Sequence, residues 1–215
     1  MIRAIVFDVD DTLLDFGKCS KHALMQACTE QNVPYSDLLY DTFNARNAFF
    51  WQQIEKGELT LAELWRIRWN LIFEELSIDA DGAAFESAFH GALDITHEKV
   101  EVAEDVLRAL HPDYVLTAAS NGRQHQQETR LRLAGLDTYL SDIVTSEMAG
   151  INKPDPAFFQ LVFDRLKTVL PDLEKSEVLM GGDSLSSDIG GASSFGFQTW
   201  YVKEHPLAEL TKKAL

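Results

Sequence analysis

Residues 2–14 read IRAIVFDVDDTLL, an apolar run that stops abruptly at three carboxylates. Its apolar part is short and unbroken, which predicts a strand buried on both faces and hence a parallel sheet. Asp8 and Asp10 are two residues apart, so both side chains would point to the same side if the backbone stayed extended beyond the strand. Two crowded carboxylates repel each other unless a cation such as Mg²⁺ or Ca²⁺ joins them. An acidic turn left in solvent would explain the same residues equally well.

Strand and helix patterns alternate from about residue 100 to the C-terminus. The predicted strands are Tyr114–Ser120, Asp142–Ser146, Val178–Asp183 and Gln198–Val202. The predicted helices are 102–110, Gln124–Ala134, Ala157–Val169, Ser187–Phe195 and Leu207–Ala214. Strict alternation of this kind predicts an α/β fold with a doubly wound parallel sheet.

Residues 17–96 have a different character, because their apolar residues recur only at helical spacing. The predicted helical segments are 21–31, 40–57, 60–77 and 83–94. Pro34 separates the first two segments. Gly57 is a predicted helix stop, and Thr60 with Glu63 forms a capping-box pattern. With no strand predicted in it, this stretch reads as a helical module inserted between residues 1–16 and 97–215.

Composition limits the partners and the location of this protein. The chain has 215 residues and a formal net charge of −15, which argues against duplex nucleic acid as a partner but allows a small anionic substrate. The sequence has no apolar run near the roughly 18 residues that span a membrane and no signal-peptide pattern, so we expect a cytoplasmic location without membrane attachment. Cys19 and Cys28 lie on one predicted helix, point in different directions and are not expected to pair.

Polar residues follow the predicted strands at the edge of the sheet where ligands bind. Ser120, Asn121 and Gly122 end the second strand, and a hydroxyl with free N–H groups before a helix suits an anion. Such a turn is, taken alone, more often a simple helix cap. Lys153 follows the third strand, next to Pro154, although a lone lysine is usually a solvated charge.

The fourth predicted strand adds more carboxylates to the same edge. It ends in Gly181, Gly182 and Asp183, and Asp188 follows five residues later. Two glycines would let the backbone approach a ligand, and Asp183 would be a third carboxylate beside Asp8 and Asp10. Taken together, these residues predict a site for a phosphate held by Mg²⁺, with a nucleophile, a proton donor and groups that neutralise charge.

These motifs, in this order, resemble the four motifs of the haloacid dehalogenase superfamily. They are DVDDT from Asp8, Ser120-Asn121-Gly122, Lys153-Pro154, and Gly182-Asp183-Ser184 with Asp188. The resemblance covers the full chain. It implies a Rossmann-like core domain made of residues 1–16 and 97–215, with an α-helical cap domain of residues 17–96.

The resemblance also implies a role for each motif residue. Asp8 would be the nucleophile that becomes aspartyl-phosphate, and Asp10 would be the general acid and then the base. Lys153 would offset the crowded negative charge, and Asp188 would orient a water molecule or Lys153. The implied phosphate-binding residues are Ser120, Asn121, Gly122 and Lys153, and the implied Mg²⁺ ligands are Asp8, Asp183 and the backbone carbonyl of Asp10.

The implied function is Mg²⁺-dependent hydrolysis of a phosphomonoester. FDVDDTLLDF, the spacing of Trp51 and Gly57, SNG and GDSLSSDIGGA resemble the branch of pyrimidine 5′-nucleotidases, although that branch more often has Thr at the position of Ser120. We therefore expect nucleoside 5′-monophosphates as substrates. A phosphatase of small sugar or organic-acid phosphates, such as phosphoglycolate, is the alternative.

Other classes fit this sequence less well. A phosphomutase shares the motifs and the cap, so it stays a minor alternative. A haloacid dehalogenase needs no proton donor and typically lacks the second aspartate, so Asp10 argues against it. A phospho-receiver domain is much shorter and lacks the helical insertion. Either a monomer or a homodimer is compatible with the sequence.

Aromatic residues in the predicted cap point to the leaving group. Phe49, Phe50 and Trp51 are consecutive, so on a helix they cannot all face one direction. At least one is expected to be exposed or to face the site, where a flat ring would stack on a nucleobase. A cationic cap suited to a small acid is the alternative, and its candidate residues are Arg46, Arg66 and Arg68.

Overall fold

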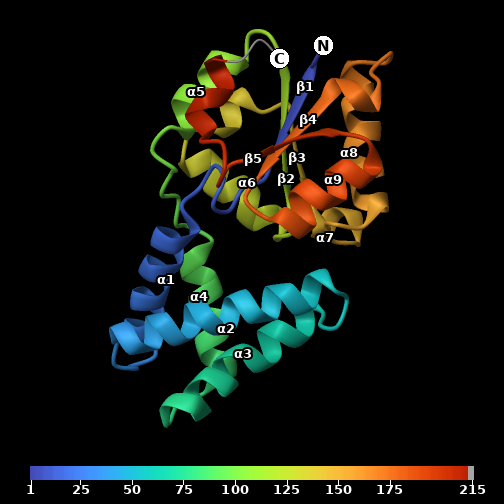
Figure 1. Cartoon of the computed structure of the whole chain (residues 1–215). Coiled ribbons are helices and arrows are strands. Elements are labelled where there is room, and N and C mark those ends of the chain that lie inside the picture. The colour runs from blue at the N-terminus through green and yellow to red at the C-terminus, as the bar shows by residue number, and fades with distance from the viewer. Residues whose placement is uncertain (213–215) are drawn as a thin grey trace. The chain divides into compact units, whose positions relative to one another are not determined.

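The computed structural model describes residues 1–212 and contains a five-stranded, all-parallel sheet (Figure 1). The strands are β1 (Ala4–Phe7), β2 (Val115–Ser120), β3 (Asp142–Thr145), β4 (Val178–Gly182) and β5 (Gln198–Tyr201). Their order is β3-β2-β1-β4-β5, so β1 lies at the centre. Phe7 is opposite Ala118 of β2 and Gly181 of β4, which brings the carboxyl ends of these three strands to one edge. The predicted α/β fold is confirmed.

Helices fill most of the remaining chain. The α-helices are α1 (Phe16–Glu30), α2 (Asp37–Glu55), α3 (Leu61–Leu76), α4 (Gly82–Leu93), α5 (Ala103–Leu110), α6 (Gln124–Leu133), α7 (Ser146–Ala149), α8 (Pro156–Val169) and α9 (Gly191–Phe195). The 3₁₀ turns are η1 (Asp137–Tyr139), η2 (Lys175–Glu177) and η4 (Leu207–Lys212), and η3 (Leu185–Gly190) is a π-helical turn.

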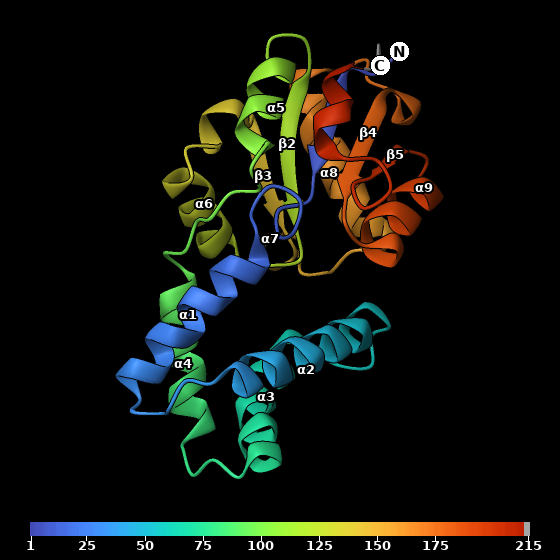
Figure 2. The same ribbon diagram turned by 60° about the vertical axis from the view of Figure 1, so that its left-hand side comes forward.

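Alternate residues of the central strand enter two separate cores, as a strand buried on both faces requires. Ile5 and Phe7 pack in a core with residues of α5, α6 and η4. Ala4 and Val6 pack in the other core with residues of α8 and α9. Figure 1 shows α5 on one side of the sheet and α8 and α9 on the other, and Figure 2 shows the same sheet from a second side.

The structure differs from the predicted elements near the C-terminus. The predicted helix Ser187–Phe195 is divided into η3 and α9, because the N–H of Ile189 donates to the Ser184 carbonyl five residues earlier and widens the turn. The predicted helix Leu207–Ala214 is a 3₁₀ turn over its described part, and its residues 213 and 214 lie outside the described residues. The short helix α7 was not predicted, and the Thr145 side chain caps it by accepting from the N–H of Met148.

The chain forms two compact units, one of Met1–Phe16 with His97–Leu215 and the other of Gly17–Thr96. The second unit has its own aromatic core, in which Trp69 stacks on Phe43 and meets Phe85 edge-on at a centroid distance of 4.5 Å. The buried guanidinium of Arg68 lies among these rings and donates to Glu86 and Asn47.

Local signals in the helical unit behave as predicted. The Thr60 hydroxyl accepts from the N–H of Glu63, and the Glu63 carboxylate accepts from the N–H of Thr60, which completes the capping box. Gly57 follows α2 with φ of 73°, a left-handed conformation that suits glycine. Cys19 and Cys28 are both buried, and they form no disulfide with each other.

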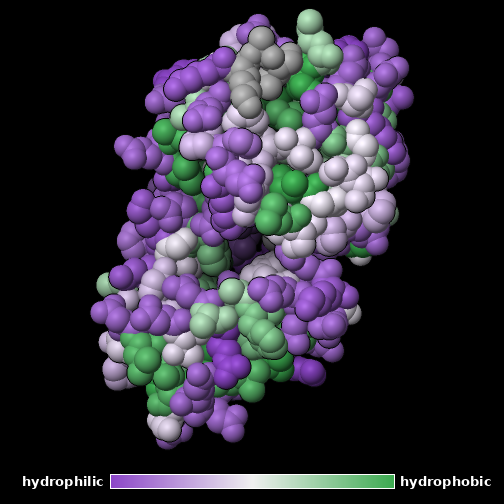
Figure 3. Space-filling model, in the orientation of Figure 1, coloured by the Kyte–Doolittle hydropathy of each residue, from purple (hydrophilic) through white to green (hydrophobic). Residues whose placement is uncertain are grey.

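On the face drawn in Figure 3, hydrophobic side chains form separate patches among hydrophilic ones. Ten large hydrophobic side chains among the described residues are exposed, including Leu38 and Phe49 on α2. Within residues 1–212, no helix is long and apolar enough to cross a membrane.

Candidate active site

The buried ammonium of Lys153 joins three of the sequence motifs. Its Nζ lies 2.7 Å from Oδ1 of Asp8, 2.7 Å from Oδ1 of Asp188 and 2.8 Å from the carbonyl oxygen of Ala119. These three acceptors match the three hydrogens of an ammonium group. Lys153 is only 1% exposed, so its charge is satisfied entirely within the protein. The predicted inward-pointing lysine is therefore found at the end of β1.

Asn121 holds the loop that carries Lys153. Its Oδ1 accepts from the N–H of Lys153 at 2.7 Å, and its Nδ2 donates to the Lys153 carbonyl at 3.0 Å. The peptide bond between Lys153 and Pro154 is cis. Asn121 was predicted as a phosphate-binding residue, but its side chain is engaged by this loop, which leaves backbone groups of the turn for a ligand.

Asp188 bridges Lys153 and the end of β4. Its Oδ1 accepts from Lys153, and its Oδ2 accepts from the N–H of Ser184 at 3.1 Å. A side chain on Gly182 would clash here, since a Cβ at that position would lie 2.3 Å from Oδ2 of Asp188. The predicted reason for this glycine was close approach of a ligand. The structure shows another reason, which is that Asp188 occupies the space.

Three carboxylates crowd together at this edge of the sheet. Oxygens of Asp8, Asp183 and Asp188 all lie within 4.8 Å of one another. Lys153 contacts two of these side chains, and Lys203 donates to Oδ2 of Asp183 at 2.8 Å. Hard carboxylate oxygens at this spacing are the donors that Mg²⁺ takes in proteins, so the residues present fit that ion.

The local environment opposes ionisation of these acids. Burial raises the pKa of Asp8 well above its ordinary value; Lys153 opposes that shift, while Asp188 and Asp183 add to it. Burial also raises the pKa of Asp183, against the contact with Lys203. Burial would lower the pKa of Lys153, but Asp188 and Asp8 outweigh burial and raise it. Three carboxylates thus face two lysines here, and a bound cation would favour the ionised form that burial opposes.

The Asp10 carboxylate has different partners. Its Oδ1 accepts from Nη1 of Arg130 at 2.8 Å, and its Oδ2 accepts from Nε2 of Gln127 at 2.8 Å. The Asp10 side chain is 31% exposed to solvent, whereas the Arg130 side chain is fully buried. Asp10 is not part of the group of side chains that could hold a metal. The predicted contribution of Asp10 to metal binding was its backbone carbonyl, and that contribution stays a prediction.

Gln127 and Arg130 were missed by sequence reasoning. The helix around them was predicted, but polar residues on a helix are ordinarily expected on its solvent face. One signal was available: Gln127, Arg130 and Leu131 have the spacing of a single helix face, and Leu131 is apolar. Polar residues that share the face of a buried leucine directly after a candidate binding turn are candidates for the site.

Ser120 lies buried beside this pair. Its Oγ accepts from the N–H of Gly122 at 3.0 Å and from Nε2 of Gln127 at 3.0 Å. A hydroxyl oxygen has two lone pairs and one hydrogen, so these two bonds use its acceptors. The hydrogen of Ser120 therefore stays available for an oxygen of a ligand, which fits its predicted phosphate contact.

Asp11 shapes the loop after β1. It has a left-handed backbone with φ of 60°, and its Oδ1 accepts from the N–H of Phe16, the first residue of α1, at 3.0 Å. Burial raises the pKa of Asp11 to about 6, with further contributions from Asp183 and Asp10. These contacts agree with a loop residue that has no catalytic role.

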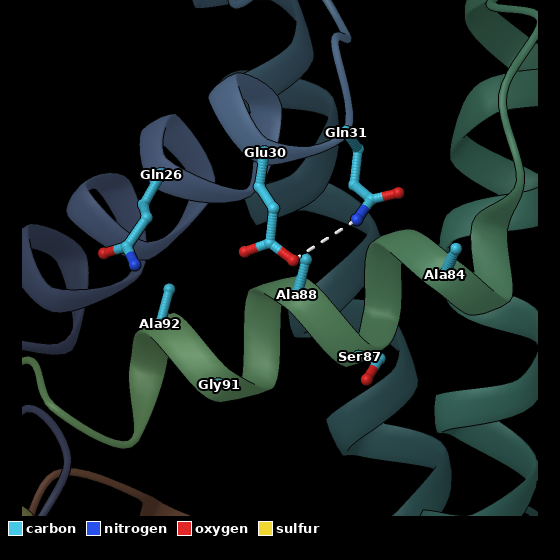
Figure 4. A pocket seen from close by; sticks show the side chains of 8 residues that line it. All are labelled: Gln26, Glu30, Gln31, Ala84, Ser87, Ala88, Gly91 and Ala92. Atoms are coloured by element: carbon cyan, nitrogen blue, oxygen red, sulfur yellow. Dashed lines mark hydrogen bonds between the residues drawn. The ribbon is translucent and has the colours of Figure 1, made fainter.

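A separate hollow of about 350 Å³ lies in the helical unit, between α1 and α4 (Figure 4). Small residues of α4 line one side, among them Ala88, Gly91 and Ala92, and Gln26, Glu30 and Gln31 line the other. The lining contains no cation and only one carboxylate. A phosphate would find no neutralising group there, so the hollow is not the candidate active site.

Known proteins resemble this chain along nearly its whole length. The sequence model of the haloacid dehalogenase-like hydrolase family matches residues 2–196. The chain is 32% identical to the HAD-hydrolase YfnB of Bacillus subtilis, over 93% of this chain and 83% of that protein. It is 30% identical to the pyrimidine 5′-nucleotidase PynA of Streptococcus pneumoniae, over 94% of this chain and 85% of that protein. It is also 30% identical to (S)-2-haloacid dehalogenase 1 of a Pseudomonas species, over 92% and 83%.

A solved structure shows the same fold. The crystal structure of YfnB bound to magnesium has a TM-score of 0.88 to this chain at 32% identity. The match covers 95% of this chain and 88% of the YfnB chain. The similarity therefore includes both the parallel sheet and the helical unit.

Loss of Lys153 is expected to destabilise the protein. In Lys153→Met, Asp8 and Asp188 would stay buried without their shared cation, and breaking such a buried pair costs about 3–5 kcal/mol. Urea unfolding followed by circular dichroism in EDTA would measure this loss, since no divalent cation could then replace the missing charge. Lys212→Met, at an exposed position of η4, is the control and should change stability by no more than about 0.5 kcal/mol. Equal stability of the two variants would contradict this account.

Proposed function

The chain belongs to the haloacid dehalogenase-like hydrolases, and we propose that it is a Mg²⁺-dependent phosphomonoesterase that acts through an aspartyl-phosphate. One observation carries the proposal: two neighbouring carboxylates have separate partners. Asp8 is held by Lys153 in the acidic cluster, and Asp10 is held by Gln127 and Arg130 outside it. A nucleophile and a proton-transfer group need separate environments, because at one pH the first must stay ionised while the second must gain and lose a proton.

In this proposal Asp8 attacks the phosphorus atom. A bond forms between a carboxylate oxygen and phosphorus as the bond to the leaving oxygen breaks. Lys153 contacts Asp8 and reduces the repulsion between a carboxylate and an anionic phosphate. Mg²⁺ bound by Asp8 and Asp183 would offset further charge on the phosphate oxygens. The free hydrogen of Ser120 would bind one of these oxygens.

Asp10 would move protons in both halves of the reaction. As an acid it gives a proton to the leaving oxygen. As a base it then takes a proton from the water that attacks phosphorus, which releases phosphate and restores Asp8. Its partly exposed side chain is able to reach a ligand, unlike that of Asp188, whose exposure is 1%.

We further propose that the leaving group is a nucleoside and that the helical unit acts as the cap that selects it. The prediction of at least one exposed aromatic residue is confirmed, since Phe49 is 50% exposed and Phe50 is buried. Two of the three arginines of a cationic alternative are already engaged: Arg68 with Glu86, and Arg46 with Glu75. This balance favours an aromatic surface over a cationic one. PynA, a relative at 30% identity, is named as a pyrimidine 5′-nucleotidase.

A haloacid dehalogenase is the second candidate, because one relative at 30% identity bears that name. Displacement of halide by a carboxylate needs no proton for the leaving group. A dehalogenase would therefore have no use for the contacts that Asp10 makes with Gln127 and Arg130. This observation favours phosphate chemistry.

The nucleophile is tested by Asp8→Asn. The amide has nearly the same shape but is a poor nucleophile and a weaker metal ligand, so activity should fall below about a thousandth of the wild type. Steady-state hydrolysis of p-nitrophenyl phosphate with Mg²⁺ measures this loss, with circular dichroism as a check on folding. Activity above that level in the folded variant would remove Asp8 from this role.

Metal removal separates the two candidate reactions. EDTA should abolish hydrolysis of p-nitrophenyl phosphate, and Mg²⁺ should restore it. Ca²⁺ should restore little activity, because its coordination is looser. Chloride release from 2-chloropropionate in the presence of EDTA, without phosphatase activity in Mg²⁺, would instead identify a dehalogenase.

The leaving group is tested by comparing kcat/KM for UMP and dUMP with that for phosphoglycolate and glucose 6-phosphate. The nucleotides should be preferred, and Phe49→Ala should lower kcat/KM for UMP by about 5–150-fold, the value of one stacking contact. Leu38→Ala, at another exposed position of α2, is the matched control and should leave that value unchanged. A tenfold advantage for a sugar phosphate or phosphoglycolate would contradict the nucleotidase proposal and leave the phosphatase proposal standing.

A further inference from the structure

Two polar residues of α6 are buried beside the reacting groups. Gln127 is 1% exposed and Arg130 is fully buried. They lie one turn apart, on the face of α6 that points into the protein. Burying a guanidinium is costly unless it is paired, and Arg130 pairs with Asp10 at 2.8 Å. Its contact with the proposed acid–base group makes Arg130 a candidate for positioning that group.

The contacts determine how the Gln127 amide is oriented. Its Oε1 accepts from Nη1 of Arg130 at 3.2 Å, so its Nε2 faces the opposite way. That nitrogen donates both to Oδ2 of Asp10 and to Oγ of Ser120. A carboxylate oxygen without a proton can only accept, which agrees with this orientation. Gln127 thus connects the proposed proton-transfer group with the proposed phosphate-binding hydroxyl.

Gly122 leaves the room that this connection needs. A Cβ at Gly122 would lie 2.5 Å from Nε2 of Gln127, which is closer than real Cβ contacts come. The N–H of Gly122 donates to Ser120 at the same time. The turn after β2 therefore serves the network from α6 as well as a ligand.

We propose that Gln127 and Arg130 are positioning residues that hold Asp10 and Ser120 in a single network. This proposal rests on the proposed phosphatase function. Each oxygen of Asp10 meets one donor, which fixes the plane of its carboxylate, and the Ser120 hydroxyl is turned so that its hydrogen faces the ligand. Neither residue acts on the substrate directly. Their effect is to keep the Asp10 carboxylate and the Ser120 hydroxyl in fixed positions relative to each other, so that proton transfer and phosphate binding take place at the same ligand.

Loss of this network would change the rates of the two steps, departure of the leaving group and hydrolysis of the aspartyl-phosphate, by different amounts. Protonation of the leaving oxygen matters for an alkyl phosphate, whereas p-nitrophenolate leaves with little help from an acid. Hydrolysis of the aspartyl-phosphate needs the base with either substrate. A network that positions Asp10 is therefore expected to affect the first step only when the leaving group is poor, and the second step always.

The test compares Gln127→Met and Arg130→Met with Arg132→Met, an exposed residue of the same helix. For an alkyl phosphate, kcat should fall about 100-fold in the first two variants, the cost of misplacing a reacting group by about 1 Å. With p-nitrophenyl phosphate, the first turnover, seen as a burst of p-nitrophenol, should slow less than about tenfold while later turnovers slow more. Arg130→Lys should recover part of kcat, and Arg132→Met should match the wild type.

Each other result has a definite meaning. An equal loss for both substrates and both steps, together with a lower Tm, would assign the pair a purely structural role and overturn the proposal. Unchanged kinetics in an active enzyme would overturn it without affecting the proposed function. An inactive wild type would overturn both. If Arg130→Met does not fold, Gln127→Met decides the question, because it leaves the arginine paired with Asp10.

Discussion

The ammonium of Lys153 is the contact on which the rest of the site depends. Its Nζ lies 2.7 Å from an oxygen of Asp8 and 2.7 Å from an oxygen of Asp188, and the side chain is buried from solvent. Two buried carboxylates at this spacing would repel each other, and neither would tolerate burial alone. Through Lys153, the loop after β3 joins the ends of β1 and β4. Asn121, at the end of β2, holds that loop in place. Residues that follow β1, β2, β3 and β4 therefore all help to place the Lys153 charge between the two carboxylates.

The buried contact between Lys153 and Asp188 also explains the backbone that follows β4. A side chain at Gly182 would clash with Asp188, which fills that space. The wide turn of η3 follows Ser184, whose N–H donates to the second oxygen of Asp188. Asp183 remains beside the cluster with Lys203 as its partner. The backbone around β4 is therefore adapted to one buried carboxylate, Asp188, while the neighbouring Asp183 is the one that we propose as a cation ligand.

The helical unit is built on a different principle. Its centre is a set of aromatic rings around Trp69, with the ion pair of Arg68 and Glu86 buried against them. Such a core is complete within the unit, so surface residues such as Phe49 can change without loss of its packing. A unit whose core and surface are separable in this way is suited to setting specificity while the chemistry stays on the sheet.

The local pattern of the sequence determined most of the fold. The parallel sheet and the helical segments were predicted from the unbroken apolar run at residues 4–7, the alternation of strand and helix after residue 100 and the helical spacing in residues 17–96. These patterns depend only on neighbours along the chain. The motif residues Asp8, Ser120, Lys153 and Asp188 were predictable too, because strand ends place their polar neighbours at one edge. Tertiary structure decided what these residues contact. The local signal at Gln127 and Arg130 is weak, a helix face shared with Leu131, and only the packing of α6 against the sheet brings them to Asp10. The space that Gly122 and Gly182 leave is filled by Gln127 and Asp188, a few residues further along the chain, and a sequence records a missing side chain without recording what takes its place.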